Sequence, residues 1–387
     1  MQGGRKVNHN IKSVSHNVLN LIKKQKAVVA IIFIFFIMIF PDTNFYTGLN
    51  LAHLLGSVST NAIIAFGVTF AVICKGCDLS VGSVMVVAGI IVIMLLNDGM
   101  TLRFAIAYAV SAGIIACFVI ALTFTSKGRN KVLAFLFGIL AGIGLGAITF
   151  AILLNMPINM VTATLLAVLA GSIVGFVNGF LIVHQKTEAF IITLGMGMLV
   201  QGIALQLTNA VNVSANDPNF QRIANDTLLG IPYIAFFTLV LGVLAFLILR
   251  FTGFGRNVYA LGGDYEVAEH SGINVIYTKW MAFVITGTFA AMAGVLAASR
   301  MNTGVTIAGV VTPLMVNCGV VLGGTSFAGG VGGVGRSFIG IFLMFLLRNS
   351  LGMLGIPPFQ QQFVLGIIIV LIISLDCYAT KRKKEAV

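Results

Sequence analysis

Residues 27–40 read AVVAIIFIFFIMIF and residues 367–375 read IIIVLIISL, and runs of this kind decide the fold class. Neither run alternates apolar with polar residues, as a strand with one wet face would. A helix of about 20 apolar residues crosses the ~30 Å hydrocarbon core of a bilayer, whereas a membrane β-barrel is built from short alternating segments. The runs therefore predict transmembrane helices.

The composition agrees with lipid as the solvent. Of the 387 residues, 58% are hydrophobic and only 9% are charged, against about 25% charged in soluble domains. A water-soluble fold of this composition would expose large apolar patches and aggregate. We therefore expect an all-α, polytopic transmembrane helical bundle of about 10–12 spans.

Twelve apolar segments are candidate spans. They are residues 27–45, 50–74, 80–97, 102–125, 132–154, 162–184, 189–209, 231–250, 279–300, 305–323, 337–350 and 362–378. The tenth and eleventh are short or interrupted by glycine. They are candidates for broken or re-entrant helices, which are tolerated where protein or water covers the backbone and which would leave ten spans.

The formal charge of +12 is explained by topology rather than by nucleic acid, because Lys and Arg flank the apolar segments instead of forming one basic face. With the N-terminus in the cytoplasm, nearly all of the 23 Lys and Arg residues lie inside. The outside ones are Arg103, Arg222, Arg300 and Arg348. This asymmetry predicts an even number of spans with both termini cytoplasmic.

The resulting organisation has three parts: a basic cytoplasmic segment at 1–26, a transmembrane domain at 27–378 and a basic cytoplasmic tail at 379–387. The first span is followed by the residues PDTNFY rather than by a small-residue cleavage site, so we expect it to be retained as an anchor. The two longest loops are a polar outside loop at 210–230 and an inside loop at 251–278.

The inside loop contains the local signals of a short helix. Asp264 is a favourable N-cap, Glu266 follows in the first turn, and Gly272 suits the position just after the end. A helix this short is not stable alone and must pack on something. The residues alone leave two partners open, a protein at the cytoplasmic face or the membrane surface itself.

Several enzyme signatures are absent from the sequence. There is no Gly-Lys dipeptide and hence no G-x-x-x-x-G-K-[ST] phosphate cradle, nor any H-E-x-x-H or G-x-S-x-G motif. The G-x-G-x-x-G at Gly330–Gly335 lacks the preceding strand and later acidic residue of a dinucleotide site, and it predicts a close-packed turn. The five His residues and five Cys residues are scattered, so we expect no metal site, and the Cys77 and Cys74 pair reads as small packing residues.

Polar residues inside spans are the remaining candidates for chemistry. Ionisable groups deep in a span mark ion relays, and their scarcity here argues against a proton-coupled pump. Asp78 is either functional, an ion-pair partner of Lys75 or a cap for the third span. Uncharged candidates for hydroxyl contacts, with interhelical hydrogen bonding as the alternative for each, are Ser57, Ser59, Thr60, Asn61, Asn178, Thr193 and Gln201.

Four blocks resemble ribose-type ABC permeases. Gly76–Ser83 (GCDLSVGS) resembles the signature G-x-D-L-S-V-G-S, and Leu322–Gly330 (LGGTSFAGG) resembles L-G-G-T-S-x-x-G-G. Residues 260–275 resemble the family's cytoplasmic loop, with Asp264 in place of the usual Asn, and residues 354–361 with Leu375-Asp376 fit the end. The matching motif residues are Gly76, Asp78, Leu79, Ser80, Gly82, Gly323, Gly324, Thr325 and Ser326. Cys77 departs from the usual aliphatic residue, and residues 126–161 look like an insertion carrying an extra span.

The resemblance implies a bacterial inner-membrane importer subunit of about ten spans. Two permeases, alike or unlike, would pair, and cytoplasmic ATPases would hold ATP and Mg. An external binding protein would deliver a monosaccharide, with loop 210–230 as the candidate docking surface. This chain would itself bind no cofactor. The family's coupling helix maps onto Gly263, Asp264, Glu266, Ala268, Glu269, Ser271, Gly272 and Ile273. Permeases for nucleosides or branched-chain amino acids, and an ion-coupled secondary transporter, are the alternatives.

Overall fold

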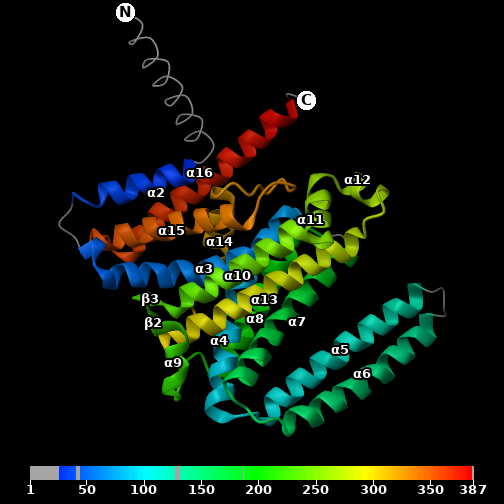
Figure 1. Ribbon diagram of the computed structural model, residues 1–387. Helices are drawn as coiled ribbons and strands as arrows, with labels where there is room; N and C mark the ends of the chain where they lie inside the picture. The colour runs from blue at the N-terminus through cyan, green and yellow to red at the C-terminus, as the bar shows by residue number, and fades with distance from the viewer. Residues whose placement is uncertain (1–25, 41–43, 127–130, 186, 386–387) are drawn as a thin grey trace, which may run out of the picture. The chain divides into compact units, whose positions relative to one another are not determined.

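The computed structural model describes residues 26–40, 44–126, 131–185 and 187–385 (Figure 1). The basic segment predicted at 1–26 lies outside the described residues except for Lys26, as do the last two residues of the tail. Within the described chain the all-α prediction is confirmed, because the strands are two residues long and pair only as two small ladders.

Seven helices are long and apolar enough to cross a membrane, judged by length and composition over the described residues. These seven are α3 (Gly48–Ile73), α4 (Val81–Asp98), α7 (Met160–Gln185), α8 (Ala189–Thr208), α10 (Tyr233–Phe251), α13 (Val275–Met301) and α15 (Val334–Met353). Further apolar helices are α2 (Lys26–Ile37), α5 (Leu102–Ser126), α6 (Lys131–Leu154), α14 (Thr312–Leu322) and α16 (Pro358–Glu385). Each predicted span thus contains a helix, and the chain is a multi-pass membrane protein.

The tenth and eleventh predicted spans differ from one another. α14 has only 11 residues, about 16 Å of helix, which is too short to cross the hydrocarbon core. The expectation of a broken eleventh span is wrong, since α15 is one uninterrupted helix of 20 residues. Its Gly340 serves close packing instead: a Cβ there would lie 1.9 Å from the carbonyl oxygen of Gly319 on α14.

The chain divides into two compact units. Unit 1 comprises residues 1–78, 227–282 and 312–387. Its core is α3, which packs against α10, α14 and α15 (Figure 1) and buries nearly all residues from Val58 to Ile73. A helix that is apolar all round is expected in such a central position, because no face needs water.

Unit 2 comprises residues 79–226 and 283–311, so α13 begins in unit 1 and continues into unit 2. Small residues bring its helix backbones together. A Cβ on Gly175 of α7 would lie 2.4 Å from the carbonyl oxygen of Phe283 on α13, which is the close approach that compensates for the weak hydrophobic drive in lipid. The strands β1 (Val213–Ser214) and β4 (Thr303–Gly304) pair antiparallel.

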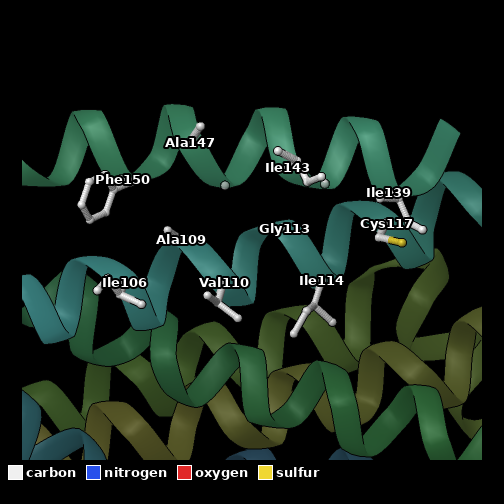
Figure 2. A pocket seen from close by; sticks show the side chains of 12 residues that line it. Ile106, Ala109, Val110, Gly113, Ile114, Cys117, Ile139, Ile143, Ala147 and Phe150 are labelled. Atoms are coloured by element: carbon white, nitrogen blue, oxygen red, sulfur yellow. The ribbon is translucent and has the colours of Figure 1, made fainter. Parts of the chain in front are cut away.

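Within unit 2, the extra span predicted at 126–161 is α6, which forms a hairpin with α5. The two helices touch through backbone, because a Cβ on Gly142 would lie 2.6 Å from the carbonyl oxygen of Gly113. Figure 2 shows the two helices side by side with a groove of about 450 Å³, lined by apolar Ile, Ala, Val, Gly, Cys and Phe residues. These side chains offer no strong hydrogen-bonding group, so the groove does not suit a solute rich in hydroxyls.

The predicted inside loop holds two helices rather than one. α11 (Gly253–Gly263) precedes α12 (Tyr265–His270), and α13 begins at Val275, ahead of the predicted start at 279. The outside loop contains α9 (Pro218–Asn225) and the ladder of β2 (Thr227–Leu228) with β3 (Ile231–Pro232).

Candidate functional site

α12 forms as its sequence predicts. Asp264 is the N-cap, and its Oδ1 accepts a hydrogen bond of 3.1 Å from the backbone N–H of Val267. Gly272 has φ +78°, the left-handed value that glycine adopts without a steric cost. Asp264 is also the C-cap of α11, so the two helices meet at one residue without a linker.

The surface of α12 is unusually bare. Ala268 is its one buried residue, while Val267 is 62% exposed and Tyr265 is 46% exposed. The predicted coupling residues Glu266 and Glu269 are exposed beside them. The helix therefore offers a mixed apolar and acidic face outward and touches its own chain on one side only.

Three segments that are far apart in the sequence converge at the base of α12, all within unit 1. They are the end of α3, the Gly262-Gly263 pair, and the glycine-rich loop after α14. The N–H of Gly330 donates to the carbonyl oxygen of Ile73 over 3.0 Å. A Cβ on Gly262 would lie 1.8 Å from that same oxygen, so only glycine fits between these backbones.

Lys75 adds a side chain to this junction. Its φ of +58° is left-handed, which costs a non-glycine residue about 1 kcal/mol. Its Nζ donates to the carbonyl oxygen of Gly263 over 3.3 Å. That carbonyl belongs to the last residue of α11, where helix carbonyls lack internal partners and attract cations.

The loop carrying the predicted motif residues Gly323, Gly324, Thr325 and Ser326 is held by hydroxyl groups. Thr325 Oγ1 lies 3.3 Å from Ser337 Oγ, which in turn lies 2.6 Å from Thr69 Oγ1 of α3. Tyr259 of α11 donates its hydroxyl to the carbonyl oxygen of Gly332 over 3.0 Å. Burial raises the pKa of Tyr259, so the hydroxyl stays protonated and able to donate. Residues 330–333 of the G-x-G-x-x-G sequence thus form a turn, as predicted, which is close-packed at Gly330 and Gly332, while Val334 and Gly335 already belong to α15.

The first part of the GCDLSVGS block closes onto α14 in unit 1. Asn317 donates to the carbonyl oxygen of Asp78 over 3.0 Å, and its Oδ1 accepts a hydrogen bond from the thiol of Cys77 at 3.5 Å. Asp78 is 1% exposed, and the N-cap position of α4 is held by Ser80. Cys74, Cys77, Cys117 and Cys318 form no disulfide, and the described residues hold no group of three or more metal-binding side chains.

The second part of the block meets two predicted pathway residues in unit 2. Thr193 Oγ1 of α8 accepts from the N–H of Leu79 over 3.1 Å, and Asn178 Nδ2 of α7 donates to Ser80 Oγ over 2.9 Å. Asn178 is fully buried, yet its Oδ1 has no hydrogen-bond partner. Gly82 is the second residue of α4, and a Cβ on Gly309 would lie 2.3 Å from its carbonyl oxygen.

The other pathway candidates are not part of this cluster. Gln201 lies two turns after Thr193 on α8 and donates to the carbonyl oxygen of Thr306 over 2.7 Å, while its Oε1 has no partner. Asn61 of unit 1 donates within its own helix to Ser57. Ser59 lies beside a largely apolar pocket between α3, α10 and α15, and Thr60 bonds back to Gly56.

The predicted docking loop is ordered by contacts inside each unit. In unit 2, Phe220 of α9 is buried and its carbonyl accepts from Ser299 Oγ over 2.6 Å. In unit 1, the turn between β2 and β3 presents Leu229, which is 93% exposed and left-handed with φ +54°. An exposed apolar residue in a strained turn is a feature of contact surfaces.

Sequence reasoning missed Lys75, Asn317 and Ser337. Lys75 was considered only as an inside charge and as a possible ion-pair partner of Asp78, yet a lysine just after an apolar helix, where glycine would fit the backbone, was an available signal. Asn317 and Ser337 bond to residues more than 200 positions away, and no local pattern marks such partners.

Comparisons with known proteins agree with the motif blocks. The family described as branched-chain amino acid transport system / permease component matches residues 131–373, more than half of the chain. The chain is 28% identical over 357 residues to the ribose import permease protein of Escherichia coli strain K12, covering 91% of this chain and 93% of that protein. It is 29% identical over 347 residues to the ribose import permease protein of Bacillus subtilis strain 168, covering 89% and 88%.

A sugar-transport relative is closer over a shorter stretch. The L-arabinose transport system permease protein of Escherichia coli strain K12 is 33% identical over 208 residues, covering 54% of this chain and 63% of that protein. No solved structure matches the chain.

Proposed function

Because this chain belongs to the family of permease components described for branched-chain amino acid transport, we propose that it is the membrane-spanning subunit of an ATP-driven importer for a monosaccharide. The permease role follows from the family. The sugar class is supported by the names of relatives that transport ribose and L-arabinose. We further propose that the subunit lies in a bacterial inner membrane, with the loop carrying α12 in the cytoplasm.

The exposed α12 carries the proposal that ATP hydrolysis occurs on a partner chain. The sequence has no phosphate cradle of its own. The two readings of the short helix can be weighed by charge. An interfacial helix usually carries Lys or Arg toward anionic lipid, whereas α12 presents Glu266 and Glu269 beside Tyr265 and Val267. This surface favours a basic and apolar groove on a cytoplasmic ATPase.

The solute pathway is proposed to pass the cluster formed by Leu79, Ser80, Asn178 and Thr193. A buried amide oxygen without a partner is costly unless something donates to it at another stage. Asn178 Oδ1 is such an acceptor, and Ser80 Oγ lies 2.9 Å from the same side chain. Hydroxyl groups of a passing sugar are suitable donors. A permease needs only weak contacts, since the pathway must release what it admits.

The outer partner is proposed to be a solute-binding protein that docks at loop 210–230. The exposed Arg222–Asp226 ion pair of 3.1 Å in unit 2 would supply polar contacts for such a partner. A second permease chain, identical or related, would complete the pathway, as the resemblance implies.

Reconstitution tests the proposed function. The purified chain, placed in liposomes with the ATPase that co-purifies with it and the corresponding binding protein, should take up ribose or L-arabinose only when ATP is present on the α12 side. Uptake driven by an ion gradient without an ATPase would contradict the proposal. Uptake of branched-chain amino acids but not sugars would keep the permease role and correct the solute, as the family description allows.

Substitution tests the pathway. Asn178→Ala should raise the apparent KM for solute and lower transport by about tenfold, because a lost hydrogen bond in a buried site is worth about 1–2 kcal/mol. Ser172→Ala is the matched control on the same helix, since Ser172 bonds back to Val168 and to Thr288. An equal loss in both variants would assign the effect to helix packing.

A further inference from the structure

Lys75 holds a strained backbone conformation for which glycine is the ordinary solution. It follows Cys74, the C-cap of α3, with φ +58°, and its N–H bonds back to the carbonyl oxygen of Val72 over 3.0 Å. Helices commonly end in this conformation with glycine, which lacks the steric penalty. A lysine here therefore needs a reason that lies in its side chain.

That side chain reaches the corner between α11 and α12. Lys75 Nζ donates to the carbonyl oxygen of Gly263, the last residue of α11. Because Asp264 serves both helices, a push on α12 reaches Gly263 without a flexible linker. Lys75 thus provides a side-chain connection, which we call the Lys75 tie, between the end of α3 and the corner at which α12 begins.

The backbone around this tie leaves little room for independent movement. Gly262 is closed in by the carbonyl of Ile73 and the N–H of Gly330, at 1.8 Å and 2.5 Å from the position of a Cβ. Gly330 donates to Ile73. These contacts join the corner to the end of α3, and the hydrogen bond from Lys75 Nζ to Gly263 adds a side-chain connection between the same two segments.

We propose that Lys75 is a positioning residue that passes movement of α12 to the GCDLSVGS segment. Gly76 follows Lys75 immediately, and the next residues, Cys77 and Asp78, bond to Asn317 of α14. Displacement of Gly263 therefore pulls on the start of the segment whose later residues contact Asn178 and Thr193. This inference rests on the proposed function and specifies how α12 is connected to the GCDLSVGS segment.

Two substitutions separate this role from a structural one. Lys75→Gly removes the ammonium and relieves the left-handed strain, so the folded protein should melt at an equal or higher temperature. Solute transported per ATP should nevertheless fall by about two- to fivefold, the effect expected for an exposed cation at a helix carbonyl end. Lys75→Met, which keeps the strain, should show the same transport loss, and Lys75→Arg should restore coupling.

Arg256→Met is the control, because Arg256 is an exposed cation on α11 itself. If Arg256→Met lowered the solute transported per ATP by the same factor, the effect would come from the overall positive charge around α11 and α12, and the proposal would be overturned. Wild-type coupling in both Lys75→Gly and Lys75→Met would also overturn it, as would a Lys75→Gly protein that melts lower.

Hydrogen exchange supplies a readout that needs no ATPase. In the purified chain, residues 262–275 should exchange about two- to fivefold faster in Lys75→Met than in the wild type. Unchanged exchange would refute the tie even if transport were lost. Absence of ATP-driven uptake by the wild type would instead contradict the proposed function and leave the exchange result to decide on the tie.

Discussion

Replacing Asp264 by alanine should loosen α12 without disturbing the membrane helices. The carboxylate of Asp264 accepts from the N–H of Val267 over 3.1 Å, and the helix it starts has only six residues. So short a helix has few internal hydrogen bonds, and most of its order comes from its two ends and from the burial of Ala268. The N-cap is therefore a large fraction of what holds it.

The magnitude follows from the bond that is lost. Removing an N-cap side chain costs about 1 kcal/mol, which is roughly a fivefold shift in the equilibrium between closed and open helix. Asp264→Asn is the matched control, because an asparagine oxygen caps equally well and is the residue usual at this position in the permeases that the loop resembles.

Amide hydrogen exchange in detergent measures the opening directly. The peptide covering α12 should exchange about fivefold faster in Asp264→Ala, while Asp264→Asn and the peptides of α3 should match the wild type. Exchange that is unchanged in the alanine variant would refute the capping argument. Equally fast exchange in the asparagine variant would show that negative charge, rather than capping, orders the helix.

Three further outcomes are expected. Gly175→Ala should lower the free energy of unfolding by about 1–3 kcal/mol, because the added methyl meets a backbone carbonyl. Gly195→Ala is the control, because the space around Gly195 is open. Equal melting points of the two variants would contradict the packing argument. Burial raises the pKa of the Cys77 thiol to about 12, so at pH 8 the thiolate is much rarer than in the unfolded chain. Maleimide labelling of Cys77 should therefore be slow until the protein is denatured, and fast labelling of the native protein would refute this. A membrane-impermeant thiol reagent should label Leu229→Cys from outside and Glu266→Cys from inside the cell, and labelling of both from one side would overturn the topology.

The membrane helices could be predicted because lipid imposes a simple demand. A span must be long, apolar and internally hydrogen bonded, so a run such as the one predicted at residues 231–250, which forms α10, can be recognised in the sequence. The ends of α12 could be predicted for a different reason: Asp264 and Gly272 act on backbone groups within three residues of themselves. Signals of this range are complete in the local sequence.

What could not be predicted depends on contacts between distant segments. α11 was missed because GFGRNVYALGG is rich in glycine, a poor helix former, and the helix is held by burial of Gly255, Val258 and Leu261. The uninterrupted course of α15 past Gly340 depends on α14 lying against it. Lys75 and Gly263 are separated by 188 positions, so their pairing leaves no trace in either neighbourhood.

The start and stop signals of α12 lie within the helix's own flanking residues, and this has a consequence for how partners can be exchanged. Residues 264–272 form a unit in which Asp264, Ala268 and Gly272 keep the shape of the helix, while the outward side chains can be substituted without changing that shape. In the proposed importer, grafting residues 264–272 from one permease onto another should transfer recognition of the partner ATPase and leave the solute preference of the recipient intact. Substitutions on the outward surface of α12 and substitutions along the proposed solute pathway can then accumulate independently in evolution.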